Sequence, residues 1–140
     1  MKGLLSSLAL AFMTLTRLPV PFAGRVAFSD EISRHSAVFF PVVGLFYGGV
    51  LFIAWRVLAT ARAPVEVQAF VLLALPYCLN RFFHLDGLAD VADAFFADRT
   101  PEDRLAILKD PRVGTFAVGT LLLFLLYRFL LLKLFLQWTH

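Results

Sequence analysis

The chain has 140 residues, of which 60% are hydrophobic and only 16% are charged. Soluble domains average about 45–50% apolar and about 25% charged residues, so this composition predicts a membrane protein. The net charge of +3 is small and scattered, without a basic stripe, which argues against nucleic-acid binding, and the single cysteine excludes an intrachain disulfide framework.

The first predicted element is an apolar helix over residues 1–22 that lies in the membrane interface and ends at Pro19 and Pro21. The alternative is a cleaved signal peptide with Lys2 as its basic start. The residues that follow lack the small-x-small pattern of a cleavage site, and Arg17 fits such a site poorly. We therefore favour the interfacial helix.

Three later segments are apolar over the roughly 20 residues that a helix needs to cross a bilayer: 36–55, 64–83 and 115–137. They predict an all-α fold, a polytopic helical membrane protein with a single membrane domain. The first segment contains a GxxxG pair, Gly44 and Gly48. This pair indicates either a close-packing face or only the ordinary frequency of glycine in membrane helices.

Proline and charged residues interrupt the later spans. Pro76 predicts a kink in the second span. Lys133, near the end of the third span, is expected to reach the interface or to pair with an acid, as intramembrane charges usually do. Arg128 lies inside the same span, and its role stays open.

The segment 84–114 holds an acidic motif followed by the only long polar loop of the chain. Within it, Thr100 is suited to be an N-cap and Pro101 to be the first helical residue. This order predicts a short amphipathic helix over 101–109. The other connection, residues 60–66, is expected to be a short turn.

Basic residues give the orientation. Four of them precede the first predicted span and five surround the polar loop, whereas the turn between the first two spans has only Arg56 and Arg62. Under the positive-inside rule, the N-terminus and the polar loop therefore face the cytoplasm.

The acidic motif contains Asp86, Asp90 and Asp93. Their i, i+4, i+7 spacing places them within roughly 60° on one helix face. Three like charges that close call for neutralisation. Asp86 alone could be a helix cap, nearby arginines could form a structural ion network, or a divalent cation such as Mg²⁺ could bind. We favour the cation, in a cytoplasm-facing site that acts on a phosphorylated substrate.

The polar loop adds further candidates. Asp110 supplies a fourth carboxylate, and Lys109 and Arg112 beside it suit phosphate binding. The same residues also fit an ordinary helix end, where basic side chains favour the negative end of the dipole. His84 is a single imidazole beside Asp86 and is either structural or a ligand.

The segments HLDGLADVADAFF and DRLAILKDPRVGTF resemble the signature region of the adenosylcobinamide-GDP ribazoletransferase (cobalamin synthase) family. The earlier segments FMTLTRLPVPF and FFPVVGLFYG are similar to that family's N-terminal helix and first span. The aspartate spacing also resembles, more loosely, the motif of the CDP-alcohol phosphotransferases.

The resemblance implies the last step of cobalamin biosynthesis at the bacterial inner membrane. With Mg²⁺ as cofactor, adenosylcobinamide-GDP and α-ribazole (or its 5′-phosphate) would give adenosylcobalamin (or its phosphate) and GMP. It also implies roles for residues of this chain: metal binding by Asp86, Asp90 and Asp93, a further ligand or base at Asp110, and contacts to phosphate or substrate by Lys109, Arg112, Arg104 and His84.

Members of that family continue through further spans, so we expect the chain to be incomplete at its C-terminus, with the missing half completing the site. A homo-oligomer is the other partner expected. Two alternatives remain, a fragment of an ion or metal transporter and a non-catalytic truncated subunit. A transporter would place carboxylates near the middle of a span. Here they follow a span, which favours a site at the membrane surface.

Overall fold

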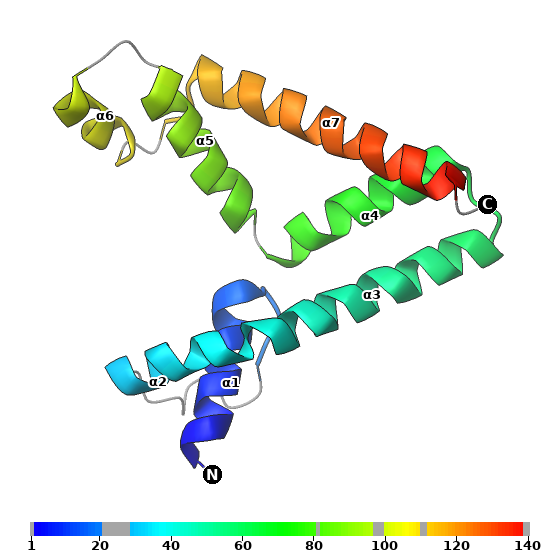
Figure 1. Cartoon of the computed structure of the whole chain (residues 1–140), viewed down its shortest axis with the longest axis horizontal. Coiled ribbons are helices and arrows are strands. Elements are labelled where there is room, and N and C mark those ends of the chain that lie inside the picture. Colours follow the sequence, from blue (N-terminus) through cyan, green and yellow to red (C-terminus); the bar gives the residue numbers. More distant parts are fainter. Residues whose placement is uncertain (1, 21–28, 81, 97–99, 110–111, 139–140) are drawn as a thin grey trace. The chain divides into compact units, whose positions relative to one another are not determined.

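The structure is a computed structural model that describes residues 2–20, 29–80, 82–96, 100–109 and 112–138. These residues form helices joined by short connections, and none of them lies in a β-strand (Figure 1). The predicted all-α fold is confirmed. The chain forms two compact units, Met1–Ala63 with Cys78–Arg81 and Pro64–Tyr77 with Phe82–His140.

The first unit packs α1 against the start of a long helix. Tyr47 donates a 2.8 Å hydrogen bond from its hydroxyl to the carbonyl oxygen of Leu15. The rings of Phe12 and Phe46 meet edge to face at 5.5 Å, and the side chain of Val43 is fully buried. The helices of this unit are α1 (Lys2–Leu15), α2 (Asp30–Ser36), the 3-10 helix η2 (Ala37–Phe39) and α3 (Phe40–Thr60).

The end of α1 differs from the prediction. The helix ends at Leu15, before either proline. Thr16 ends it, because its hydroxyl donates to the carbonyl oxygen of Phe12 at 2.7 Å and accepts from the N–H of Leu18 at 3.2 Å. Side chains of this type offer the backbone an alternative to the next helical hydrogen bond.

The short helix α2 has no counterpart among the predicted elements. Ser29 caps it, with its hydroxyl accepting a 3.2 Å hydrogen bond from the N–H of Ile32. Asp30 and Glu31 follow in the first turn, where negative charge favours a helix start. The signal was therefore present in the sequence as a serine followed by two acids.

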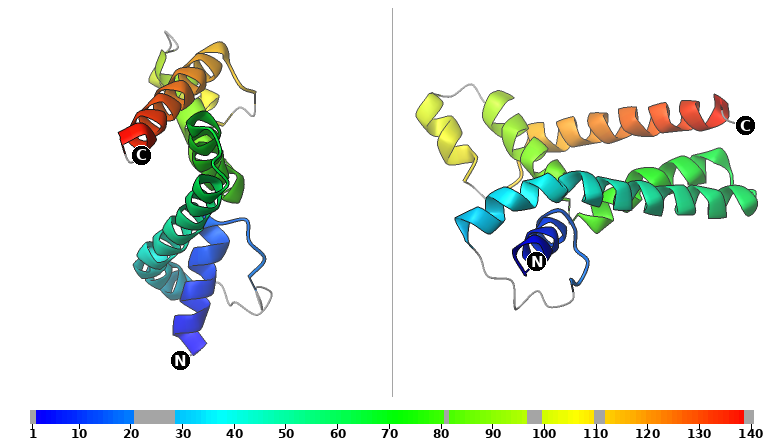
Figure 2. Two further views of the ribbon diagram at one scale, coloured as in Figure 1. Left: turned by 90° about the vertical axis from the view of Figure 1, so that its right-hand side faces the viewer. Right: turned by 60° about the horizontal axis from the view of Figure 1, so that its bottom comes forward.

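The second unit contains α5 (Phe83–Phe96), α6 (Pro101–Ile107), α7 (Thr115–Trp138) and α4 (Val65–Leu79) as far as Tyr77. Figures 1 and 2 show α6 beside α5 and the start of α7 next to the C-terminal end of α5. Thr100 caps α6, with its hydroxyl accepting a 3.3 Å hydrogen bond from the N–H of Asp103. The predicted cap and short helix are confirmed, with the helix ending two residues early.

The chain turns sharply between α4 and α5, which are bent by 89°. Pro76 lies inside α4, and the helix continues past it to Leu79. Phe82 has a left-handed φ of 62°, its N–H donates to the carbonyl oxygen of Tyr77 at 3.0 Å, and the two rings stack at 6.4 Å. The carbonyl oxygen of Phe82 then accepts from the N–H of Asp86, so this residue ends one helix and begins the next.

Two continuous helices are long and apolar enough to cross a membrane, Asp30–Thr60 with 31 residues and Thr115–Trp138 with 24. They contain the first and third predicted spans. The second predicted span corresponds to α4, which together with the bent α5 meets the same test as a broken span or a re-entrant loop. The fold is that of an all-α membrane protein.

The GxxxG pair of α3 shows no close helix contact. A Cβ atom placed on Gly44 or Gly48 would meet no atom within 4 Å among the described residues. The close-packing interpretation is therefore not realised within this part of the chain.

Candidate functional site: the acidic helix and its corner with the last span

The three aspartates lie on α5 at the edge of its buried face. Leu85, Ala89 and Ala92 are buried and repeat with the same i, i+4, i+7 spacing, one residue earlier than the aspartates. One residue is about 100° around a helix, so the acidic stripe flanks the buried stripe. Because α5 packs mainly against α7, the carboxylates border the contact between these two helices.

Asp86 is exposed and lies in the first turn of α5. It is not the N-cap, because the helix begins at Phe83, and the interpretation of Asp86 as a simple cap is wrong. Asp90, one turn further on, is half-buried. Within the described ranges, no hydrogen bond or ion pair engages either of these two side chains, so both carboxylates are available to a ligand.

Asp93 is different, because both of its oxygens are occupied. Oδ2 accepts a 2.6 Å hydrogen bond from the N–H of Gly114, and Oδ1 accepts a 2.8 Å hydrogen bond from the N–H of Ala117. The first N–H groups of a helix have no partner inside that helix. Asp93 therefore caps α7 from a neighbouring helix, with its negative charge at the positive end of the dipole.

Gly114 is required at this corner. A Cβ atom at that position would lie 2.5 Å from Oδ1 of Asp93 and 2.8 Å from its Cγ. Beside it, the rings of Phe96 and Phe116 lie 5.9 Å apart, and Ala117 is fully buried. The sequence-based prediction missed this pairing, because it joins Gly114 to a carboxylate 21 residues earlier in the chain.

The predicted basic residues lie on the segments around the acidic helix. Arg104 is exposed on α6, which packs beside α5, and Lys109 is exposed just after that helix. Arg112 is also exposed and is engaged in an interaction. Arg104 thus lies on the helix that packs against α5, and the side chains of Lys109 and Arg112 are exposed between that helix and α7 in the sequence.

Two further predicted site residues have different outcomes. His84 is exposed in the first turn of α5, where its ring meets that of Phe83 at 5.6 Å. Asp110 lies outside the described residues, so its expected role stays a prediction.

The carboxylates of α5 fit a magnesium ion that takes few protein ligands. Among the residues that the structure describes, no group of three or more His, Cys, Asp or Glu side chains is close enough to hold a metal. Mg²⁺ is usually bound by one or two carboxylates, with waters and substrate phosphates completing its coordination. Asp86 and Asp90, one helical turn apart and unengaged, fit that smaller requirement.

The helices and the acidic motif define a class of protein, a helical membrane protein with an acidic helix followed by a polar loop. Within that class, the chain belongs to the cobalamin-5-phosphate synthase family, whose model matches residues 7–139. No solved structure matches the chain.

Three relatives are each named adenosylcobinamide-GDP ribazoletransferase. The protein of Chlorobium phaeobacteroides (strain BS1) is 45% identical over 137 residues, covering 96% of this chain and 50% of the relative. That of Halalkalibacterium halodurans is 39% identical over 132 residues (94% and 49%), and that of Clostridium perfringens (strain 13) is 36% identical over 117 residues (84% and 47%). The chain thus spans about half the length of the curated relatives it matches.

Proposed function

We propose that this chain supplies the half that contains the aspartate helix α5 of an enzyme that joins adenosylcobinamide-GDP to α-ribazole, or to its 5′-phosphate, with the help of Mg²⁺. The products are adenosylcobalamin, or its phosphate, and GMP. The observation that carries the proposal is the pair of unengaged carboxylates, Asp86 and Asp90, on a helix within the family match. The names of the relatives supply the two substrates.

The proposed reaction is a phosphoryl transfer. A ribose hydroxyl of α-ribazole attacks the phosphorus attached to cobinamide, the bond from that phosphorus to the bridging oxygen breaks, and GMP leaves with the electron pair. The hydroxyl proton passes to a base, for which Asp110 is the candidate. Such reactions depend mainly on positioning and on neutralising phosphate charge.

Each side chain then has a separate task. Asp86 and Asp90 would hold Mg²⁺, which would neutralise the negative charge of the diphosphate. His84 is exposed two residues before Asp86 and is a further substrate contact. The phosphate oxygens are contacted by three cations of the polar segment that follows, Arg104, Lys109 and Arg112.

Asp93 receives a structural task in this proposal. Because both of its oxygens already accept backbone N–H groups, we assign metal binding to Asp86 and Asp90 and assign to Asp93 the positioning of α7. This narrows the set of three metal ligands expected from the resemblance.

The reaction is tested in membranes that contain the chain, adenosylcobinamide-GDP, α-ribazole and Mg²⁺, with cobalamin and GMP as the measured products. A second sample adds the part of the Chlorobium phaeobacteroides relative that lies beyond the match, as a separate polypeptide. Product in either sample supports the proposed function. Absence of product from both, with the full-length relative active in the same membranes, contradicts it.

Single substitutions test the division among the carboxylates. Asp86→Asn and Asp90→Asn are expected to lower the rate more than about tenfold and to raise the Mg²⁺ concentration needed, without a change in thermal stability. Asp93→Asn is expected to lower thermal stability, because Asp93 caps α7. Glu102→Gln, at an exposed acid of α6, is the matched control. An Asp90→Asn protein with unchanged rate and Mg²⁺ dependence would remove Asp90 from the metal site.

We further propose that the site faces the cytoplasm at the bacterial inner membrane, on the grounds of the charge distribution. In a Cys78→Ser background, Glu102→Cys, at an exposed position, should resist a membrane-impermeant maleimide in intact cells. Ala61→Cys, also at an exposed position, should react. The reverse labelling pattern would overturn the orientation.

A further inference from the structure

Arg128 lies near the middle of the last membrane helix. In the 24-residue helix Thr115–Trp138 it is about 2 Å from the midpoint, at a rise of about 1.5 Å per residue. With this helix centred in a hydrocarbon layer about 30 Å thick, an aqueous surface lies about 15 Å from Arg128 in either direction. An arginine at this depth cannot reach the interface by extending its side chain along the helix.

The guanidinium of Arg128 has only a weak partner within the described residues. It lies 5.8 Å from the centre of the Phe124 ring, and no described carboxylate is within 4 Å of it. The other cation of the same helix, Lys133, forms a 2.9 Å ion pair with Glu66. Arg128 is therefore the cation of α7 that still lacks an acid in this part of the chain.

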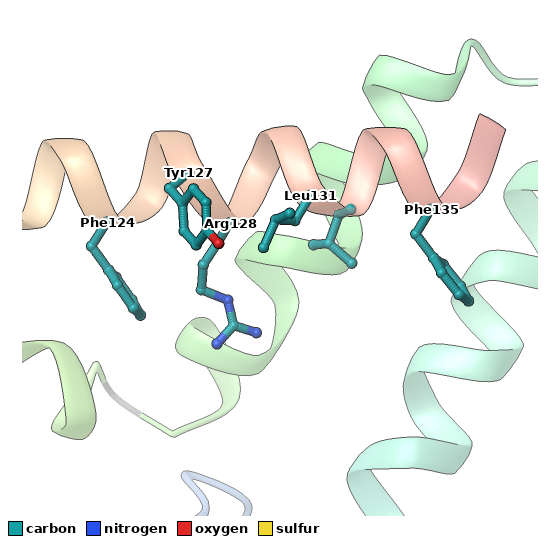
Figure 3. A pocket seen from close by; sticks show the side chains of 6 residues that line it. Phe124, Tyr127, Arg128, Leu131 and Phe135 are labelled. Atoms are coloured by element: carbon teal, nitrogen blue, oxygen red, sulfur yellow. The ribbon is translucent and has the colours of Figure 1, made fainter. Parts of the chain in front are cut away.

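Arg128 lines an apolar groove on the surface of α7. The groove has a volume of about 480 Å³ and is lined by Phe124, Tyr127, Arg128, Leu131, Leu132 and Phe135. Figure 3 shows the side chains of Phe124, Arg128 and Phe135 extending from the same side of α7. The lining positions recur at intervals of three and four residues, the pattern by which one helix receives another.

The depth and chemistry of this groove limit its occupant. A lipid headgroup carries its charge at the interface, too far from Arg128. In a second copy of this chain, residues 36–60, 67–79 and 115–138 contain no Asp or Glu, and the aspartates of α5 follow the sharp turn at Phe82, next to the polar segment that precedes α7. Charge in the membrane interior is normally paired within a helical bundle. The matching occupant is a different membrane helix that has a carboxylate at the same depth.

The part of the relatives outside the match is long enough to contain such a helix, since the matched part is only 47–50% of their length. We propose that the groove of α7 receives a membrane helix from the remaining half of the family's length, and that an Asp or Glu of that helix pairs with Arg128. This pairing does not depend on the proposed reaction.

The chemistry is tested by binding of defined peptides to the full chain in phosphatidylcholine vesicles. The probes are membrane-spanning polyleucine helices with one central Glu, Gln or Leu, and binding is followed by energy transfer from a dye on Cys78, the single cysteine. The Glu peptide should bind about three- to tenfold more tightly than the other two. Arg128→Leu should abolish this preference, and Arg128→Lys should retain it.

Lys133→Leu is the matched control, because Lys133 already has an acid partner, and the preference should survive it. Equal binding of the three peptides, or a preference that survives Arg128→Leu, would overturn the proposal. The same assay is then run with peptides from successive apolar segments of the Chlorobium phaeobacteroides relative beyond its matched half. Arg128-dependent binding should be confined to a segment with an Asp or Glu, and binding only by segments without one would also overturn it.

Discussion

Asp93 and Gly114 lie 21 residues apart in the sequence and are joined by a 2.6 Å hydrogen bond from the glycine N–H to the aspartate Oδ2. The absence of a side chain at Gly114 makes this approach possible, since a Cβ there would be 2.5 Å from Oδ1. One carboxylate thereby fixes where the last membrane helix begins relative to the acidic helix.

Gly114→Ala should destabilise this corner. The added methyl group overlaps the carboxylate of Asp93, and overpacking of this kind costs about 1–3 kcal/mol. We expect a lower midpoint of thermal unfolding in detergent. Gly119→Ala is the control, because its Cβ would meet nothing within 4 Å and alanine favours a helix interior. Equal effects of the two substitutions would contradict the close approach.

Tyr47→Phe should loosen α1 from α3 without disturbing the ring contacts. It removes the hydrogen bond from the hydroxyl to the carbonyl oxygen of Leu15, a loss of about 1 kcal/mol. The measurement is amide hydrogen exchange in the last turn of α1, which should become faster. Tyr127→Phe, at a tyrosine that is 61% exposed, should leave that exchange unchanged.

Thr100→Ala should shorten the lifetime of α6. The hydroxyl of Thr100 accepts from the N–H of Asp103, and loss of an N-cap costs about 1 kcal/mol. Hydrogen exchange at Asp103 should accelerate about fivefold, the equivalent of that free energy. Thr100→Ser keeps the acceptor and should behave as the parent chain does. Fast exchange in both variants would show that the methyl group, and not the cap, matters.

Reversal of the ion pair between α4 and α7 tests its contribution. Lys133→Glu places two carboxylates where a 2.9 Å pair exists, so the thermal midpoint should fall. Adding Glu66→Lys restores opposite charges and should recover most of the loss. If the thermal midpoint of the double variant fell by the sum of the falls in the two single variants, the ion pair would contribute nothing to stability.

Hydrophobic length and capping residues made much of the fold predictable. Thr115–Trp138 matches the expected third span to within one residue, and Thr100 caps α6 as expected. Lys133 pairs with Glu66, one of the two outcomes expected for it. These features depend on residues close in sequence or on a continuous apolar run.

The features that were missed depend on distant residues. The i, i+4, i+7 spacing correctly placed three aspartates on one face, but it treated them as equivalent. Asp93 differs from Asp90 only because the N-terminus of a helix more than twenty residues later lies against it. The turn at Phe82 was also missed, since a left-handed phenylalanine has no local signature.

The continuous helix Asp30–Thr60 is longer than the layer it is suited to cross. Its 31 residues extend about 46 Å, against about 30 Å of hydrocarbon. Tilting alone would need about 50°, beyond the roughly 0–40° that membrane helices adopt. The surplus must therefore project into the headgroups and water, and the exposed charges of α2, Asp30, Glu31 and Arg34, identify the projecting end. This projecting, charged helix end makes the protein sensitive to bilayer thickness, because in a thicker membrane the charged turn would lie closer to the lipid tails.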